Sequence, residues 1–158
     1  MFREVTRKKQ RLTQEQCIEI LKRELRGVLC VMGDDEYPYG VPMNHFYDER
    51  DGAIYFHSGK FGHRFEALHK HNKVCFTVLD QPRKEGEHWA YIINSVIVFG
   101  KIEFVEDTDR IIDYGRRFSA KFTDDQKFIE DAIERSTVAT CLMKLVPEHI
   151  TGKRVVED

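Results

Sequence analysis

The sequence predicts a mainly β fold with added helices (α+β), in which about six antiparallel strands form a barrel. Three observations support this class. Short apolar runs of strand length alternate with clusters of turn residues. Capping signals mark helices between and beside the strands. The apolar run 91–106 would extend about 50 Å if it were flat, and a bend at Gly100 therefore favours closure into a barrel.

The first helix is marked by a capping box, which Thr13 and Gln16 form. Leu12 can pack on Cys17 as a hydrophobic staple. An apolar stripe at helical spacing follows: Cys17, Ile18, Leu21 and Leu25. Gly27 is expected to end this helix.

Three strands joined by turns are then expected as a meander: 27–32, 39–48 and 53–58. Pro42 cannot donate a backbone hydrogen bond, so its strand is predicted to lie at an edge or to bend there. A short helix with Phe61, Phe65 and Leu68 on one face comes next. The strand 73–80 follows it.

The second half of the chain predicts a polar loop at 81–89 and then the long strand 91–106. Asp107 or Thr108 caps the next helix, and Thr123 with Gln126 forms a capping box for another. The apolar residues of these two helices are Ile111, Tyr114, Phe118, Phe128, Ile129, Ala132 and Ile133. A final strand within 137–153 is expected to end at Pro147.

Length and composition predict one domain over residues 1–158, with 1–11 as a flexible leader. No apolar run approaches the roughly 20 residues of a membrane span, and the N-terminus lacks the apolar core of a signal peptide. A cytoplasmic protein without membrane contact is expected. The net charge of −2 gives no electrostatic reason to expect nucleic acid. Neither the cysteine nor the histidine spacing predicts a metal site, and the four cysteines are expected to be reduced core residues.

The segment 55–72 begins as a strand and ends as a helix, and their junction is rich in cations and glycine. A helix N-terminus offers unpaired N–H groups and partial positive charge, which favour phosphate. Hydroxyl, cationic and flexible backbone groups at this junction come from His57, Ser58, Gly59, Lys60, Gly62, His63 and Arg64. The junction therefore predicts an anion site. A solvent-exposed turn before a basic helix is the alternative interpretation.

Four segments also carry a family resemblance: VPMNHFYD (41–48), IYFHSGKFGHRFEAL (54–68), KVCFTV (73–78) and SVIVFGKIEFVED (95–107). In this order and spacing they resemble the flavin-binding split-barrel proteins of the pyridoxamine 5′-phosphate oxidase superfamily. The nearest likeness is to the nitroimidazole-resistance (nitroimidazole reductase-like) branch, and it covers about residues 3–155. The arginine and histidine signature with which the oxidase proper binds its substrate has no counterpart in the C-terminal EHITGKRVVED, so oxidation of vitamin B6 is not expected.

The resemblance implies a six-stranded antiparallel split barrel that forms a homodimer, with FMN bound between the subunits. It implies that the phosphate lies at the strand-to-helix junction and that the second strand runs along the flavin ring. The implied cofactor-binding residues are Met43, Asn44, His57, Ser58, Lys60, His63, Arg64 and Ser95. Ser95 would reach the flavin across the dimer interface. His57 is the catalytic candidate, as a protonated imidazole that donates to a reduced substrate.

These expectations together indicate an FMN-dependent oxidoreductase that reduces a small, flat, electron-poor molecule such as a nitroaromatic, with NADH or NADPH as reductant. A non-catalytic FMN carrier or sensor is the first alternative. A tetrapyrrole-handling relative of the same barrel is the second. A structural interaction module, which would be colourless, is the third.

Overall fold

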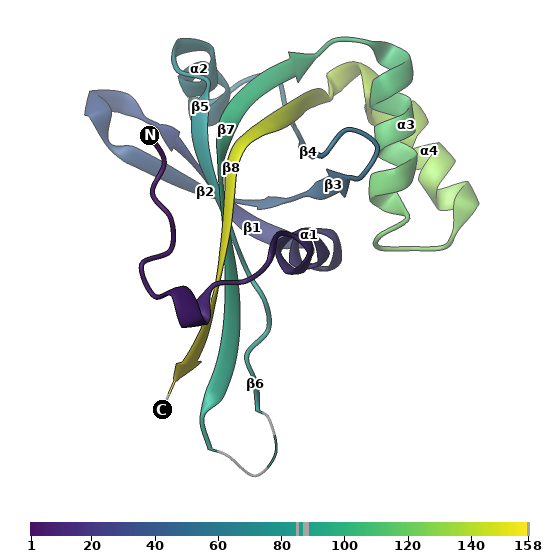
Figure 1. The fold of residues 1–158 in the computed structure, drawn as a ribbon. Coiled ribbons are helices and arrows are strands. Elements are labelled where there is room, and N and C mark those ends of the chain that lie inside the picture. Colours follow the sequence, from purple (N-terminus) through teal and green to yellow (C-terminus); the bar gives the residue numbers. More distant parts are fainter. Residues whose placement is uncertain (85, 87–88, 158) are drawn as a thin grey trace.

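The computed structural model of the chain describes all residues except 85, 87, 88 and 158 (Figure 1). Its helices are α1 Gln14–Arg23, α2 His63–Lys70, α3 Thr108–Ser119 and α4 Gln126–Ser136. Short 3₁₀ helices occur at Lys8–Gln10, Asp34–Glu36 and Thr137–Ala139. The strands are β1 Arg26–Met32, β2 Pro38–Asn44, β3 Phe46–Asp48, β4 Ala53–Ser58, β5 Lys73–Leu79, β6 Arg83–Lys84, β7 Tyr91–Val105 and β8 Cys141–Glu157.

All the strands pair antiparallel in one curled sheet, in the order β2-β1-β5-β7-β8-β4-β3, with β6 paired to β7. β2 and β3 are the two edges, so the barrel is split between them. Figure 1 shows the long β7 and β8 running through the molecule, with α3 and α4 packed together on one side. This confirms the predicted fold class. None of the described helices is long and apolar enough to cross a membrane.

The barrel interior is an apolar core to which alternate residues of every long strand contribute. Its largest fully buried side chains include Phe56, Phe76, Leu29, Ile54, Met143 and Leu145. A second, smaller cluster joins α3 to β4 and contains Tyr55, Tyr114 and Phe118. Cys17 and Cys141 are buried as expected, whereas Cys30 and Cys75 are half-buried and lie opposite one another on the outer face of the sheet.

The structure describes eight strands where the sequence predicts about six. One added strand is the two-residue β6 within the predicted loop 81–89, of which residues 85, 87 and 88 lie outside the described part. The other arises because the run 39–48 divides at His45 into β2 and β3. Pro42 does lie in an edge strand, as predicted.

The predicted meander of three strands is wrong in its middle connection. β1 pairs with β2, and β3 pairs with β4, but β2 and β3 lie at opposite edges of the sheet. His45, between them, is fully buried, and its Nε2 donates to the carbonyl of Leu21 near the end of α1, 2.8 Å away. Lys121 donates to the backbone carbonyls of His45 (3.1 Å) and Glu24 (3.0 Å).

Gly27 does not end the first helix. The Thr13–Gln16 capping box is present, but α1 ends at Arg23 and Gly27 lies inside β1. A Cβ at Gly27 would be 2.5 Å from the Phe76 ring, so glycine is needed there for strand packing.

Pro147 does not end the last strand, because β8 continues to Glu157. The pairing of β7 and β8 shifts register between Phe99 and Gly100, so that Gly100 pairs with Pro147 and Glu148 is extra. A residue at such a bulge makes no ladder hydrogen bond, and a proline is tolerated there. This register shift confirms the bulge predicted at Gly100. Glycine is needed there for close packing, since a Cβ would lie 2.2 Å from the Val146 carbonyl oxygen.

Of the caps predicted for the two later helices, one is confirmed and the other is wrong. Asp107 caps α3 by accepting from the Arg110 amide, as expected. Asp125, not Thr123, caps α4, by accepting from the Phe128 amide at 3.0 Å. Thr123 accepts from the amide of Asp125 instead, 3.2 Å away.

The leader, residues 1–11, lies against the outer face of β7 and β8. The amide of Leu12, which follows the leader, donates to the carbonyl of Gly152 at 3.0 Å. The Phe2 ring stacks on Phe99 and on His149, with centroids 5.5 and 5.1 Å apart.

Candidate functional site

The junction between β4 and α2 forms a positively charged corner, which we call the anion corner: Ser58, Lys60, Arg64 and the first turn of α2. The chain positions it locally, because β4 ends at Ser58 and α2 begins at His63. Gly62 adopts φ +99°, which favours glycine, and nothing lies within 4 Å of the position of a Cβ there. No side chain caps α2, so its first N–H groups have no side-chain acceptor.

The two cations of the anion corner lack a carboxylate partner among the described residues. Lys60 donates to the Val138 carbonyl at 2.8 Å. Arg64 donates from Nη1 to the thioether sulfur of Met43 at 3.0 Å, and its buried Nε has no hydrogen-bond partner. Burial raises the pKa of the Cys141 thiol, while the nearby Lys60 and Arg64 cations both lower it.

An unpartnered guanidinium N–H beside an uncapped helix N-terminus is a site that an anion can complete. Arg64 can offer two donors to a phosphate, and Lys60 offers a point charge. Ser58 Oγ donates to the carbonyl of Gly59 at 2.9 Å and can turn toward an anion by rotation of one bond. The corner therefore fits a phosphate group.

A hollow of about 310 Å³ adjoins this corner, and we call it the ring slot: Arg26, Pro42, Met43, Asn44 and His57. Met43 is buried, and the Arg64 hydrogen bond to its sulfur links the slot to the corner. Asn44 Oδ1 accepts from Arg26 Nε at 2.8 Å, because the two residues are opposite one another in the β1–β2 pair.

His57 lies between the ring slot and α3. The ring packs edge-on against Phe118, with centroids 4.8 Å apart, and its Nδ1 is 3.3 Å from the hydroxyl of Tyr114. Burial raises the pKa of Tyr114 well above its usual value, so the phenol stays protonated. No other polar partner of this hydroxyl occurs in the described structure. The buried O–H therefore donates to Nδ1, and the hydrogen of the neutral imidazole is on Nε2.

The pKa of His57 bears on the catalytic role predicted for it. Burial, and secondly the nearby Arg64 cation, lower the pKa of this imidazole below its usual value of 6.5. A lowered pKa favours the neutral ring over the protonated imidazole. In the geometry described here, His57 can donate a hydrogen bond from Nε2.

Two of the predicted cofactor-binding residues lie apart from this group. His63 is turned toward the β1–β2 hairpin, where it is 3.4 Å from the Asp34 carboxylate and stacks on Tyr39 at 4.4 Å. Ser95 lies on β7 between Leu79 and Lys153 and lines a separate hollow with the leader. Within one chain, the structure brings Met43, Asn44, His57, Ser58, Lys60 and Arg64 together.

Sequence reasoning missed Arg26 and Tyr114 as parts of the site. Arg26 is the first residue of β1, and only its register with Asn44 reveals that it faces the slot. Tyr114 appeared as one more apolar position on its helix. Its hydroxyl reaches His57 across 57 residues of sequence.

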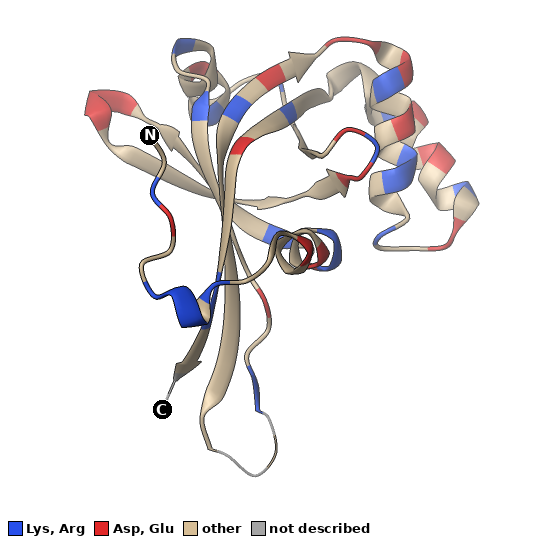
Figure 2. Cartoon of the chain, viewed as in Figure 1, with Lys and Arg blue, Asp and Glu red and all other residues tan. Residues whose placement is uncertain are grey.

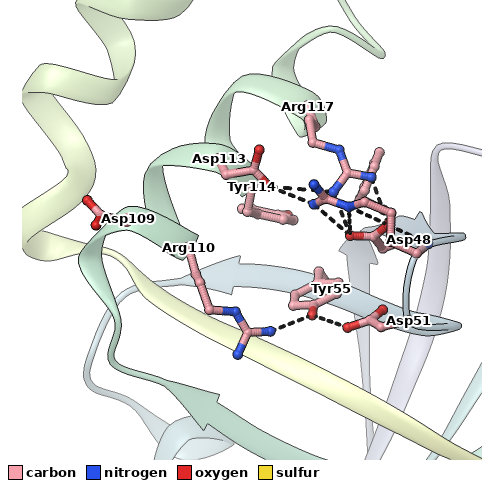
Figure 3. Close-up of a pocket in the computed structure, with 10 residues that line it drawn as sticks. Asp48, Asp51, Tyr55, Asp109, Arg110, Asp113, Tyr114 and Arg117 are labelled. Carbon is pink, nitrogen blue, oxygen red and sulfur yellow. Dashed lines mark hydrogen bonds and ion pairs between the residues drawn. The ribbon is translucent and has the colours of Figure 1, made fainter.

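A second charged hollow, of about 420 Å³, lies between β3, β4 and α3 (Figure 3). Asp48, which is 5% exposed, accepts from Arg117 at 2.5 and 2.8 Å and from Arg50 at 3.0 to 3.2 Å. Arg110 donates to the hydroxyl of Tyr55, which donates to Asp51; burial and Asp51 raise the pKa of Tyr55 to about 12. Arg50 and Arg117 are both paired with Asp48 and Asp113, so this network holds α3 on the sheet. Among the arginines of this hollow, Arg110 donates to the neutral hydroxyl of Tyr55 rather than to a carboxylate.

Comparison with known proteins agrees with this fold. The family model for pyridoxamine 5′-phosphate oxidase matches residues 13–154. A solved structure from Bacteroides thetaiotaomicron, named for 5-nitroimidazole antibiotic resistance, is 23% identical with TM-score 0.79, covering 93% of this chain and 87% of that one. A flavocytochrome from Azotobacter vinelandii is 20% identical with TM-score 0.72, covering 98% and 75%. An FAD-binding protein from Mycobacterium smegmatis is 20% identical with TM-score 0.61, covering 93% and 98%. None of the curated proteins matches the chain.

Proposed function

The chain belongs to the pyridoxamine 5′-phosphate oxidase family, and from this premise we propose that it is an FMN-dependent oxidoreductase that reduces a small, flat, electron-poor molecule such as a nitroaromatic. FMN consists of a phosphate joined through a sugar alcohol to a flat ring. The chain provides an anion corner and, next to it, a slot lined by strand residues.

The observation that carries this proposal is the unpartnered Nε of Arg64 beside an uncapped helix N-terminus. A buried donor without an acceptor costs free energy, and a phosphate oxygen would supply that acceptor. Phosphate binding would also screen the Arg64 charge that lowers the pKa of His57. Ligand binding at the corner is thereby coupled to the state of the imidazole in the slot.

When bound, the flavin supplies the electron transfer, and the protein binds, orients and shields it. Arg64 and Lys60 hold the phosphate, and Met43 and Asn44 face the ring. His57, held by Tyr114 and Phe118, presents Nε2–H to the slot as a hydrogen-bond donor to the substrate. NADH or NADPH is the proposed reductant.

We further propose that the working unit is a homodimer with the flavin at its interface. Beside the part that the leader covers, the outer face of the sheet carries partly exposed apolar side chains: Val28, Met32, Leu79, Ile97 and Phe99 are 36 to 60% exposed. Figure 2 shows charge on the four α-helices, the leader and the β1–β2 hairpin, while the first half of β7 is uncharged. Ser95 and Asn44 lie on this same outer side, by the register of β2, β1, β5 and β7. A second copy can therefore bring its own Ser95 toward the slot.

The phosphate assignment is tested by the double variant Lys60→Gln/Arg64→Gln, with Lys70→Gln as a control that removes a cation from the far end of the same helix. Binding of FMN and of riboflavin is followed by quenching of flavin fluorescence. The double variant should bind FMN at least about 100-fold more weakly and riboflavin nearly as well as the wild type, because only FMN has the phosphate. Equal loss for the two flavins, or no loss, would refute the assignment.

Catalysis and assembly are tested separately on the FMN-loaded protein. An oxidoreductase should oxidise NADH or NADPH continuously in the presence of a nitroaromatic acceptor, whereas a flavin carrier should show no steady-state turnover. Light scattering should give twice the 18.7 kDa mass of the chain. A monomer that turns over at full rate would contradict the shared site.

A further inference from the structure

A hollow of about 1010 Å³ lies at the end of the barrel where α1 ends, β5 ends and β7 begins. We call it the Asn94 groove. The lining residues that matter here are Arg23, Arg26, Leu79, Asp80, Asn94 and Phe122. Arg26 also lines the ring slot, so the two hollows meet at its side chain.

Asn94 is 7% exposed and has one polar atom without a partner. Its backbone amide and its side-chain Nδ2 each donate to the Asp80 carboxylate at 2.6 Å. These bonds fix the orientation of the carboxamide, since Nδ2 must face Asp80. The remaining atom, Oδ1, is buried and accepts no hydrogen bond from the protein. A ligand N–H or O–H that reached this oxygen from the groove would satisfy it.

The groove also holds a guanidinium without a carboxylate partner in the described structure. Asp80 is paired with Arg83 at 3.0 Å and with Arg23 at 3.6 Å, so those charges compensate one another. Arg26, by contrast, donates to the neutral carboxamide of Asn44. Its other N–H groups are left to receive an anion, and a planar carboxylate matches their geometry.

Apolar side chains complete the lining. Leu79 is 60% exposed and Phe122 44% exposed, and both contribute to the wall of the groove. Burying such surfaces against a flat ring is favourable.

We propose that the Asn94 groove binds a flat aromatic carboxylate, with the carboxylate on Arg26 and an N–H or O–H group of the ligand donating to Asn94 Oδ1. The proposal names the substrate class for the function proposed above, and it rests on that function only for the reaction, not for the binding. A ligand whose carboxylate binds Arg26 would lie beside the ring slot, in which His57 presents Nε2–H.

Three probes separate the two contacts: 4-hydroxybenzoate, its neutral counterpart 4-hydroxybenzamide, and benzoate, which lacks the hydroxyl donor. Binding to the purified full-length protein is measured by titration calorimetry. The hydroxybenzoate should bind at least about tenfold more tightly than either of the others. Arg26→Gln should lower the affinity for the hydroxybenzoate to that for the amide and leave the amide unchanged. Arg135→Gln, which removes an exposed arginine of α4, should change nothing.

Equal affinities for the three probes, or an equal loss from Arg26→Gln and Arg135→Gln, would overturn the proposal. The probe series alone decides the matter if the Arg26 variant fails to fold. FMN affinity is measured on the same samples. Carboxylate binding without FMN binding would refute the proposed function and leave this site standing. FMN binding without discrimination among the probes would do the reverse.

Discussion

Replacing His45 with glutamine should make the protein markedly less sensitive to acid. Burial, with a further contribution from Lys121, lowers the pKa of His45 from 6.5 to about 4. The unfolded chain therefore takes up a proton near pH 6.5 that the folded protein excludes until about pH 4. Because the unfolded state binds more protons in this interval, the free energy of unfolding falls as the pH falls through it. The stabilising contribution is complete above the unfolded pKa.

The magnitude follows from the difference between the two pKa values. About 2.5 units separate them, and each unit corresponds to about 1.4 kcal/mol. The full loss is therefore about 3 kcal/mol near pH 4, of which about 2 kcal/mol is already lost at pH 5. Losses of this size are a large part of the stability of an ordinary domain.

Glutamine is the informative replacement, because its side-chain amide can still donate to the Leu21 carbonyl that His45 Nε2 now contacts, yet it does not titrate. Urea unfolding is followed by circular dichroism for both proteins between about pH 8 and pH 5. The difference between their free energies of unfolding should move by about 2 kcal/mol in favour of the variant as the pH falls. Both proteins contain the same carboxylates, so the contributions of these groups to the pH dependence of unfolding cancel in this difference. Parallel stability curves over the whole range would refute the reasoning.

Three further predictions concern packing and local hydrogen bonds. Tyr114→Phe removes the donor to His57 Nδ1. The ¹⁵N shifts of the imidazole should then move from those of the Nε2–H tautomer toward an average of the Nε2–H and Nδ1–H tautomers. Unchanged shifts would contradict the assignment of the hydrogen to Nε2. Gly100→Ala places a methyl group 2.2 Å from a carbonyl oxygen and should cost about 2 kcal/mol or more in thermal unfolding, whereas a loss below about 0.5 kcal/mol would show that the strands separate freely there. Asp125→Ala should destabilise by about 1 kcal/mol and Thr123→Ala by less, since Asp125 makes the cap; equal losses on chemical denaturation would assign the cap wrongly.

Features that depend on neighbouring residues could be predicted from the sequence. The capping box at Thr13 involves residues three apart, and the bend at Gly100 follows from the length of one uninterrupted run. The errors at Gly27 and Pro147 have the opposite origin. Their environments are set by Phe76 and by the register of β7 against β8, which are distant in sequence.

The candidate site shows the same division. Ser58, Lys60 and Arg64 could be grouped in advance because a single strand-to-helix junction carries them. Arg26 and the Asn94 groove could not be assigned to the site in advance, because their positions depend on which strands pair with one another. The direction of a side chain is also invisible in the sequence. Histidine is a residue type that can bind an anion, but the His63 side chain lies against Asp34 in the β1–β2 hairpin instead.

The split in the barrel has a geometric consequence. β2 ends at Asn44 and β3 begins at Phe46, so the two free edges are joined covalently through a single residue. Two residues of extended chain span at most about 7 Å, which limits how far the edges can separate at that end. Any separation of β2 from β3 must therefore pivot at residue 45. The gap between the two edges would be widest at the far ends of the strands, at Pro38 and Asp48.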